Sequence, residues 1–101
     1  MAYAAKHNPD RCPTHPGEVI KDILTDIGMT KTAIASALGI SRQHFYDILN
    51  CKKPVSPDVA ARLGKFFGDG PGIWLRMQAA HDAWHAEREV DVSDIPTIKA
   101  A

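Results

Sequence analysis

The chain has 101 residues, of which 45% are hydrophobic and 24% charged, and its formal net charge is zero. This length suits one domain with a modest core and excludes two domains of ordinary size. No apolar run approaches the roughly 20 residues of a membrane helix, and residues 1–18 lack the apolar segment of a secretory signal. We therefore expect a cytoplasmic protein, in which Cys12 and Cys51 form no disulfide.

The first predicted helix falls within residues 15–28, after a polar arm at 1–13. Pro16 stands near its start, and Glu18 places a negative charge in the first turn. Gly28 ends the pattern. Five apolar residues form one stripe at helical spacing, which predicts packing on a core: Val19, Ile20, Ile23, Leu24 and Ile27.

A helix-turn-helix is predicted from two short helices at about 31–38 and 41–50. Thr30 and Ser41 are their N-cap residues, and Gly39 opens the turn where a positive φ is needed. In DNA-binding proteins with this motif, the second helix enters the major groove while its inner face is held rigidly. The alternative is an ordinary helix hairpin in a bundle. The apolar or small residues fall where the two helices must pack: Ile34, Ala35, Leu38, Ile40, Phe45 and Ile48.

Two further helices complete a predicted all-α fold of five helices. Ser56, Pro57 and Asp58 form an N-cap, a first-turn proline and a first-turn acid, which predicts a helix to about Phe67. Glycines and a proline at 68–72 break the chain before a last helix, which runs from near Pro71 to about Glu89; the tail receives no assignment. The expected core comprises Val19, Ile23, Leu38, Phe45, Leu63 and Phe66, with Val59 and Phe67 also buried.

Motifs on both sides of the helix-turn-helix resemble one family. The chain is similar to the HigA/VapI antitoxins, a branch of the Cro/repressor-type (XRE) regulators, over roughly Thr14 to Asp82. The resemblance implies a repressor-like five-helix fold, with a DNA-binding domain at 14–70 and a dimerisation segment at 71–101. It also implies a homodimer on a palindromic operator, a small mRNA-cleaving toxin as partner, and repression of the pair's own operon. The motifs are His15-Pro16-Gly17-Glu18, Ala61-Arg62-Leu63 with Phe66-Phe67-Gly68, and Trp74-Leu75 followed by Gln78-Ala79-Ala80.

Two positions depart from the family pattern. Cys51 follows Asn50, where the family usually has a glycine that ends the recognition helix in a left-handed conformation. Cysteine in that conformation costs on the order of 1 kcal/mol, which favours a different helix end. Gly72 replaces the usual polar residue ahead of the aromatic residue of the last helix.

The expected DNA contacts follow from helical geometry. With Phe45, Ile48 and Leu49 inward, the opposite side of the helix carries Gln43 and its neighbours. Arg42 suits guanine and Gln43 suits adenine. Asp47 can accept a hydrogen bond from cytosine, or orient Arg42 or another neighbour, and His44 is either a backbone contact or plain surface. Thr30–Thr32 and the two lysines after the helix suit phosphate. The predicted DNA-binding residues are Thr30, Lys31, Thr32, Ser41, Arg42, Gln43, His44, Tyr46, Asp47, Asn50, Lys52 and Lys53.

The charge distribution supports DNA binding only weakly. Residues 41–53 hold three basic residues and one acidic residue, whereas residues 54–101 hold five basic and seven acidic ones. Two alternatives therefore stay open: a transcriptional regulator of the same family without a toxin, and a protein-interaction module that no longer binds DNA.

The last helix carries more apolar surface than one monomer needs. Trp74 can seal the core while other large side chains remain outside it, a patch that is unusual on a monomer. We therefore predict a dimer interface on this helix and the segment after it, formed by Trp74, Met77, Trp84 and Val90.

His81 and His85 have the i, i+4 spacing of a zinc protease helix, with aspartate in place of the usual glutamate. A third ligand is not evident, and His7, Cys12 and His15 in the arm do not supply a pattern for one. We therefore predict neither a metal, nor a cofactor, nor catalytic activity.

Overall fold

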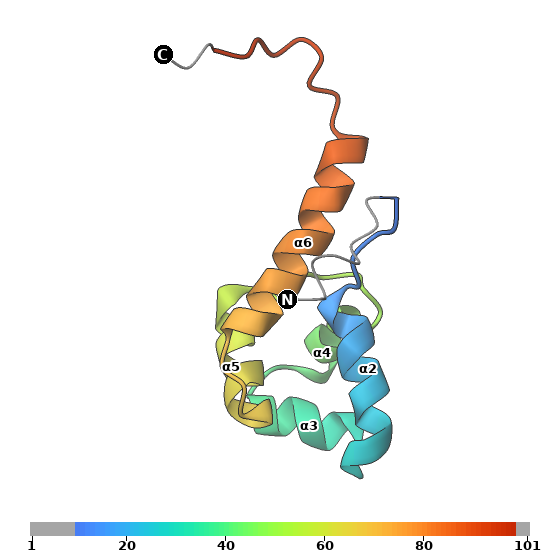
Figure 1. The fold of residues 1–101 in the computed structure, drawn as a ribbon. Helices are drawn as coiled ribbons and strands as arrows, with labels where there is room; N and C mark the ends of the chain where they lie inside the picture. The colour runs from blue at the N-terminus through green and yellow to red at the C-terminus, as the bar shows by residue number, and fades with distance from the viewer. Residues whose placement is uncertain (1–9, 99–101) are drawn as a thin grey trace.

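The structure, a computed structural model, describes residues 10–98, which form five α-helices and no strand. Figure 1 shows their arrangement. Parts of the N-terminal arm and of the tail, with His7, lie outside the described residues. The all-α, five-helix prediction is confirmed. The helices are α2 (Pro16–Ile27), α3 (Lys31–Leu38), α4 (Arg42–Leu49), α5 (Pro57–Phe67) and α6 (Gly72–Glu89).

Side-chain caps explain why the helices begin where the sequence predicts. Thr30 Oγ1 accepts from the Ala33 N–H at 3.0 Å, and Ser41 and Ser56 cap α4 and α5 in the same way. These bonds satisfy backbone donors that have no partner within the helix. The cap of α2 was not predicted: Nδ1 of His15 accepts from the Gly17 N–H at 2.9 Å.

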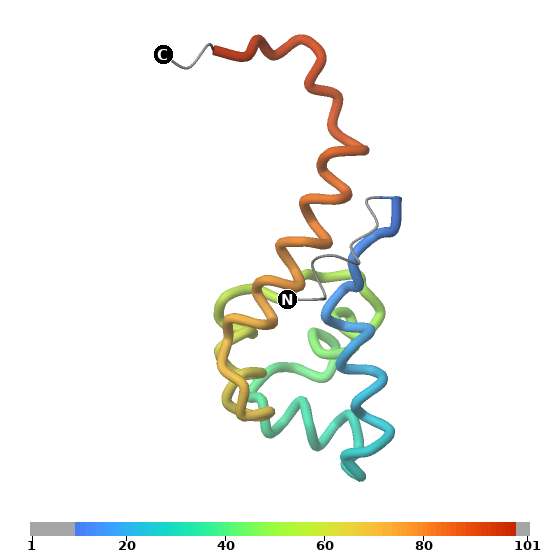
Figure 2. Tube along the Cα trace, viewed as in Figure 1, coloured from blue at the N-terminus to red at the C-terminus, as the bar shows by residue number. Residues whose placement is uncertain are grey.

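Helices α2 to α5 form a bundle from which α6 projects. In the bundle α4 packs on α2 and α3, α5 packs on α3, and α6 contacts α5 and α2. The Cα trace shows the C-terminal part of α6 leaving the bundle and the tail continuing beyond it (Figure 2). The radius of gyration is accordingly 16.4 Å, against about 13 Å for a compact domain of 100 residues. The molecule is therefore elongated along α6.

The core lies where α2, α3, α4, α5 and the start of α6 meet. Leu38, Phe45 and Leu63 are buried as predicted, and so is Val59. The predicted core positions Val19, Ile23 and Phe66, and also Phe67, are only partly buried. On α2, the buried face differs from the predicted one for a steric reason. Its buried face runs through Pro16, Gly17 and Ile20, because α4 approaches so closely that a Cβ at Gly17 would lie 1.9 Å from the Ile48 carbonyl oxygen.

Candidate nucleic-acid interface

The turn between α3 and α4 is fixed from two sides. Gly39 adopts a φ of 75°, as predicted, and its N–H donates to the Ser36 carbonyl at 3.1 Å. From α5, Nη1 of Arg62 donates to the Leu38 carbonyl at 3.0 Å, while its Nε donates to Asp58 at 2.6 Å. Arg62 thus fills carbonyl acceptors that the end of α3 leaves open. Sequence reasoning placed Arg62 only in a family motif and missed this positioning role.

Helix α4 has one apolar face that packs against the core and one polar face that points outward. Phe45, Ile48 and Leu49 are buried, as predicted. The predicted DNA-contacting set lies on the outside: His44 and Asp47 are half-buried, and the exposed members are Thr30, Lys31, Thr32, Ser41, Arg42, Gln43, Tyr46, Asn50, Lys52 and Lys53. Nζ of Lys31 lies 5.7 Å from the centre of the Tyr46 ring, so the start of α3 meets the outer face of α4. Contact of these residues with DNA stays a prediction.

Asp47 organises part of this outer face. Its carboxylate accepts from Nε2 of Gln43 at 2.9 Å and lies 3.8 Å from Nζ of Lys53. The side chain is only 17% exposed. The structure gives Asp47 two neighbours as partners, Gln43 and Lys53, in place of the Arg42 considered from the sequence. Gln43 is a proposed base contact and Lys53 a proposed phosphate contact.

The end of α4 contradicts the sequence-based expectation. Cys51 adopts the left-handed conformation with a φ of 61°, the only residue other than glycine with a positive φ among residues 10–98. Its N–H donates to the Ile48 carbonyl at 3.0 Å and the Lys52 N–H donates to the Asp47 carbonyl at 2.8 Å, the pair of bonds of a Schellman motif. The helix therefore ends as in the family despite the cysteine. Partial burial and nearby Glu18 raise the pKa of the Cys51 thiol.

The loop after α4 is tied to α6 by Gln78. Its Oε1 accepts from the Val55 N–H at 2.7 Å, and its Nε2 donates to Asp82 at 2.9 Å. Gln78 is 5% exposed and Val55 is buried. This bond positions the segment that carries Lys52 and Lys53. Sequence reasoning missed the role, although a glutamine on the inward side of a helix was a signal for a buried polar contact.

Comparison with known proteins identifies relatives of this chain, although no protein-family model matches it. Virulence-associated protein I of Dichelobacter nodosus is 34% identical over 76 residues, which cover 74% of this chain and 70% of that protein. Antitoxin HigA-1 of Vibrio cholerae is 35% identical over 75 residues, covering 73% and 70%. The chain belongs to the HigA/VapI-type antitoxin family.

Solved structures agree with this family. A Nostoc punctiforme protein described as an antidote of a plasmid maintenance system is 41% identical, with a TM-score of 0.75 over 77% of this chain and 86% of that one. Antitoxin GraA in complex with its operator is 30% identical, with a TM-score of 0.76 over 90% and 93%. Both are helical, and the similarity extends beyond the helix-turn-helix into α6.

In this HigA/VapI-type chain, the residues predicted for a dimer interface differ in their accessibility. Trp74 is only 2% exposed, and its Nε1 donates to Asp69 at 3.0 Å. It belongs to the core of one chain, so its placement in the interface is corrected. Met77 and Trp84 are half-buried and Val90 is 58% exposed. An interface formed by these three residues stays a prediction.

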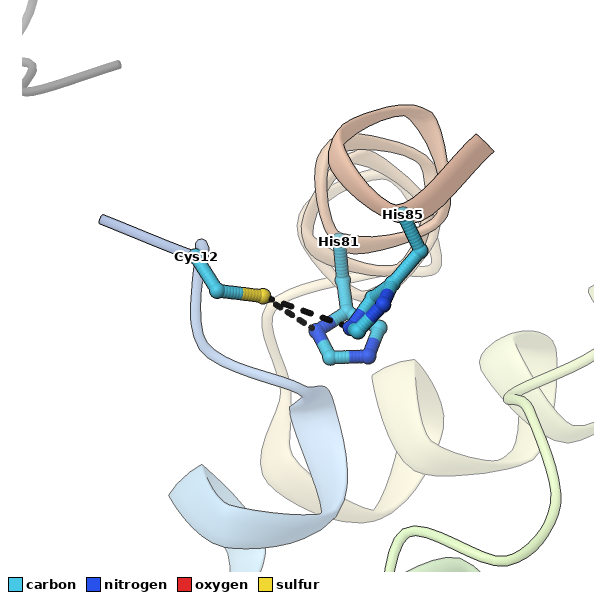
Figure 3. Close-up of side chains that lie close together, drawn as sticks. All are labelled: Cys12, His81 and His85. Atoms are coloured by element: carbon cyan, nitrogen blue, oxygen red, sulfur yellow. Dashed lines mark hydrogen bonds between the residues drawn. The ribbon is translucent and has the colours of Figure 1, made fainter. Parts of the chain in front are cut away.

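The structure also brings a third side chain to the histidine pair of α6. Sγ of Cys12 lies within 3.5 Å of ring nitrogens of both His81 and His85 (Figure 3). Cys12, for which the sequence showed no pattern joining it to the histidine pair, comes from the segment before α2. Within residues 10–98, no helix of this antitoxin-family chain is long and apolar enough to span a membrane.

Proposed function

We propose that this chain is the antitoxin of a toxin–antitoxin pair. It binds a palindromic operator as a homodimer, represses its own operon, and neutralises a small mRNA-cleaving toxin in the cytoplasm without catalysing a reaction. One observation carries the proposal: α4 is held by a buried apolar face and presents a continuous polar face outward, in a chain whose relatives include an antitoxin in complex with its operator.

The geometry supports division of the polar face into base and phosphate contacts. Arg42 stands at the N-terminus of α4, the end that meets base edges in this docking mode. Arg42 pairs with guanine and Gln43 with adenine by bidentate hydrogen bonds. Residues 30–32 at the N-terminus of α3 and Lys52 with Lys53 after α4 hold phosphates on either side.

A homodimer places two copies of α4 on one face of the DNA. Two half-sites one helical turn apart require the recognition helices to be separated by about 34 Å. We place the twofold contact on α6, because α6 leaves the bundle (Figure 1) and carries the exposed apolar residue Ile73, with Val90 directly after its end. Twofold symmetry in the protein then matches the inverted repeat.

The decisive test is titration of the full chain against the inverted repeat upstream of its reading frame at about 100 mM salt. A scrambled duplex of equal length and composition is the control. We expect the repeat to bind about 10³-fold or more tightly than the control. Equal binding to both duplexes would leave only the protein-interaction module.

A second experiment separates an antitoxin from a regulator without a toxin. Expression of the neighbouring small reading frame should arrest growth, and co-expression of this chain should restore it. Operator binding without such rescue would favour the regulator, a reading supported by a 31% identical Escherichia coli relative named as an HTH-type transcriptional regulator.

A further inference from the structure

Three potential metal ligands converge between the N-terminal segment and α6. Cys12 precedes α2, whereas His81 and His85 lie one turn apart on α6, and all three side chains turn toward one point (Figure 3). Sγ of Cys12 is 3.5 Å from Nδ1 of His81 and 3.5 Å from Nε2 of His85. The three ligand atoms lie within 4.8 Å of one another.

These separations match the coordination shell of zinc. Zn–S and Zn–N bonds of about 2.3 and 2.05 Å at a tetrahedral angle place the sulfur and nitrogen atoms about 3.6 Å apart. We propose that Cys12, His81 and His85 bind one zinc ion per chain, with water as the fourth ligand. Sulfur and nitrogen donors favour zinc over magnesium and calcium, which prefer oxygen ligands.

The surroundings of His85 support this assignment. Nδ1 of His85 hydrogen-bonds the Glu89 carboxylate, one turn further along α6. Nδ1 must therefore carry the proton, which leaves the Nε2 lone pair directed at Cys12. A carboxylate that orients a histidine through its other nitrogen is the usual outer shell of a zinc ligand.

Zinc binding requires a change of tautomer at His81. Its Nδ1 donates to the Pro13 carbonyl at 2.8 Å, so the ring proton must move to Nε2 before Nδ1 can bind the ion. His15 borders the site without joining it: its ring centre lies 5.1 Å from that of His81, and its Nδ1 is engaged by the Gly17 N–H. The bound ion would join the segment before α2 to α6.

Cobalt(II) titration of the full chain tests the site, because cobalt replaces zinc and reports thiolate ligation by a charge-transfer band. We expect one ion per chain, displaceable by zinc, with the band lost in Cys12→Ser. Cys51→Ser is the matched control, since it removes the other cysteine, which is exposed. Absence of stoichiometric binding, or a band that depends on Cys51 and not on Cys12, would overturn the proposal.

A second pair of variants leaves all three ligands in place. Glu89→Ala removes the carboxylate that orients His85 and should weaken zinc binding about 10- to 100-fold. Glu87→Ala removes the same charge from the same exposed turn, where it pairs with Arg88, and should change zinc affinity by less than about twofold. Equal affinities for both variants would show that Glu89 does not support a zinc ligand and would contradict the outer-shell role assigned to it. Operator binding by the metal-free chain tests the proposed function separately.

Discussion

At the scale of single residues, Asp47 determines how two proposed DNA contacts are presented. In the free protein it holds Gln43 by a hydrogen bond and Lys53 by an ion pair. A base edge must compete for Gln43 and a phosphate must compete for Lys53. The negative charge of Asp47 also opposes phosphate nearby, so the residue favours specificity over bulk affinity for DNA.

Substitutions of these two partners should have different consequences. Gln43→Ala should cost about 1–3 kcal/mol on the operator and relax preference at one base pair. Lys53→Ala should weaken all duplexes alike and reduce the salt slope by about one. Titration of operator variants at several salt concentrations measures both effects. If both variants showed the same sequence-independent loss, Gln43 would not contact a base.

His15 makes the stability of the chain depend on pH. Burial and the neighbouring His81 lower the pKa of His15 from its ordinary 6.5, and only the neutral ring accepts from the Gly17 N–H. The unfolded chain therefore binds this proton more readily than the folded one, so stability is complete above pH 6.5 and is lost as the pH falls from 6.5 through the lowered pKa.

The variant His15→Asn keeps a side-chain acceptor at the N-cap but does not titrate in this range. Urea unfolding at a series of pH values between 5 and 8 compares the two chains. The difference in their free energies of unfolding should shrink as the pH falls below 6.5. Parallel pH profiles would contradict the role of His15, because the other histidines are common to both chains.

At the scale of helices, the C-terminal end of α4 requires a left-handed backbone conformation at Cys51, which is unfavourable for a residue with a side chain. The left-handed conformation of Cys51 costs about 1–2 kcal/mol relative to a right-handed one. Cys51→Gly should raise the free energy of unfolding by about 0.5–1 kcal/mol, because relief of this strain exceeds the extra flexibility of glycine in the unfolded chain. Thermal or urea denaturation measures the gain. Cys51→Ala removes the thiol but keeps the strain, so an equal gain there would assign the effect to the sulfur.

The link between α6 and the loop after α4 is a single buried side chain. Gln78→Ala would leave the buried Val55 N–H without its acceptor, which costs about 1–3 kcal/mol of stability. Operator affinity should also fall, because the loop carries Lys52 and Lys53. Gln43→Ala is the control for stability: Gln43 is exposed, and its loss should change the free energy of unfolding by less than about 0.5 kcal/mol. Denaturation curves with similar midpoints would argue against the link.

At the scale of the whole molecule, α6 and the tail leave apolar surface beyond the needs of one chain. Ile73 and Val90 are exposed, as are Val92, Ile95 and Ile98 of the tail. A groove along the N-terminal half of α6 is lined by Pro13, Thr14, Val19, Ile73, Arg76, Met77 and Ala80. These features support the predicted dimer contact on α6.

Truncation locates this contact. A chain ending at His81 loses Trp84 and Val90 and should stay helical, become monomeric, and bind the operator about 100-fold more weakly because bivalency is lost. Sedimentation and operator titration measure these effects. A chain ending at Glu89 keeps all of α6 and shows whether the tail is needed. A dimer that persists after truncation at His81 would place the interface elsewhere.

Much of the fold was predictable because its determinants are local. Thr30, Ser41 and Ser56 each bind a backbone N–H three residues away, so the starts of three helices are encoded in short stretches of sequence. Gly39 and the inward spacing of Phe45 and Ile48 indicate the helix-turn-helix for the same reason. The polar residues on the outer face of α4 follow from helical periodicity once the inward face is known.

The remaining features depend on contacts between distant parts of the chain. Gln78 and Val55 are 23 residues apart, and Cys12 and His81 are 69 apart, so only the crossing of α6 over the bundle brings them together. Ile20 becomes the center of the buried face of α2 because α4 packs against Gly17, a contact that periodicity does not specify. The sequence by itself determined the helices and the polar residues on the outer face of α4, because both depend on local spacing. Tertiary structure decided the burial of Trp74, the attachment of the loop after α4 to α6 and the cysteine–histidine cluster, because each depends on how the helices pack.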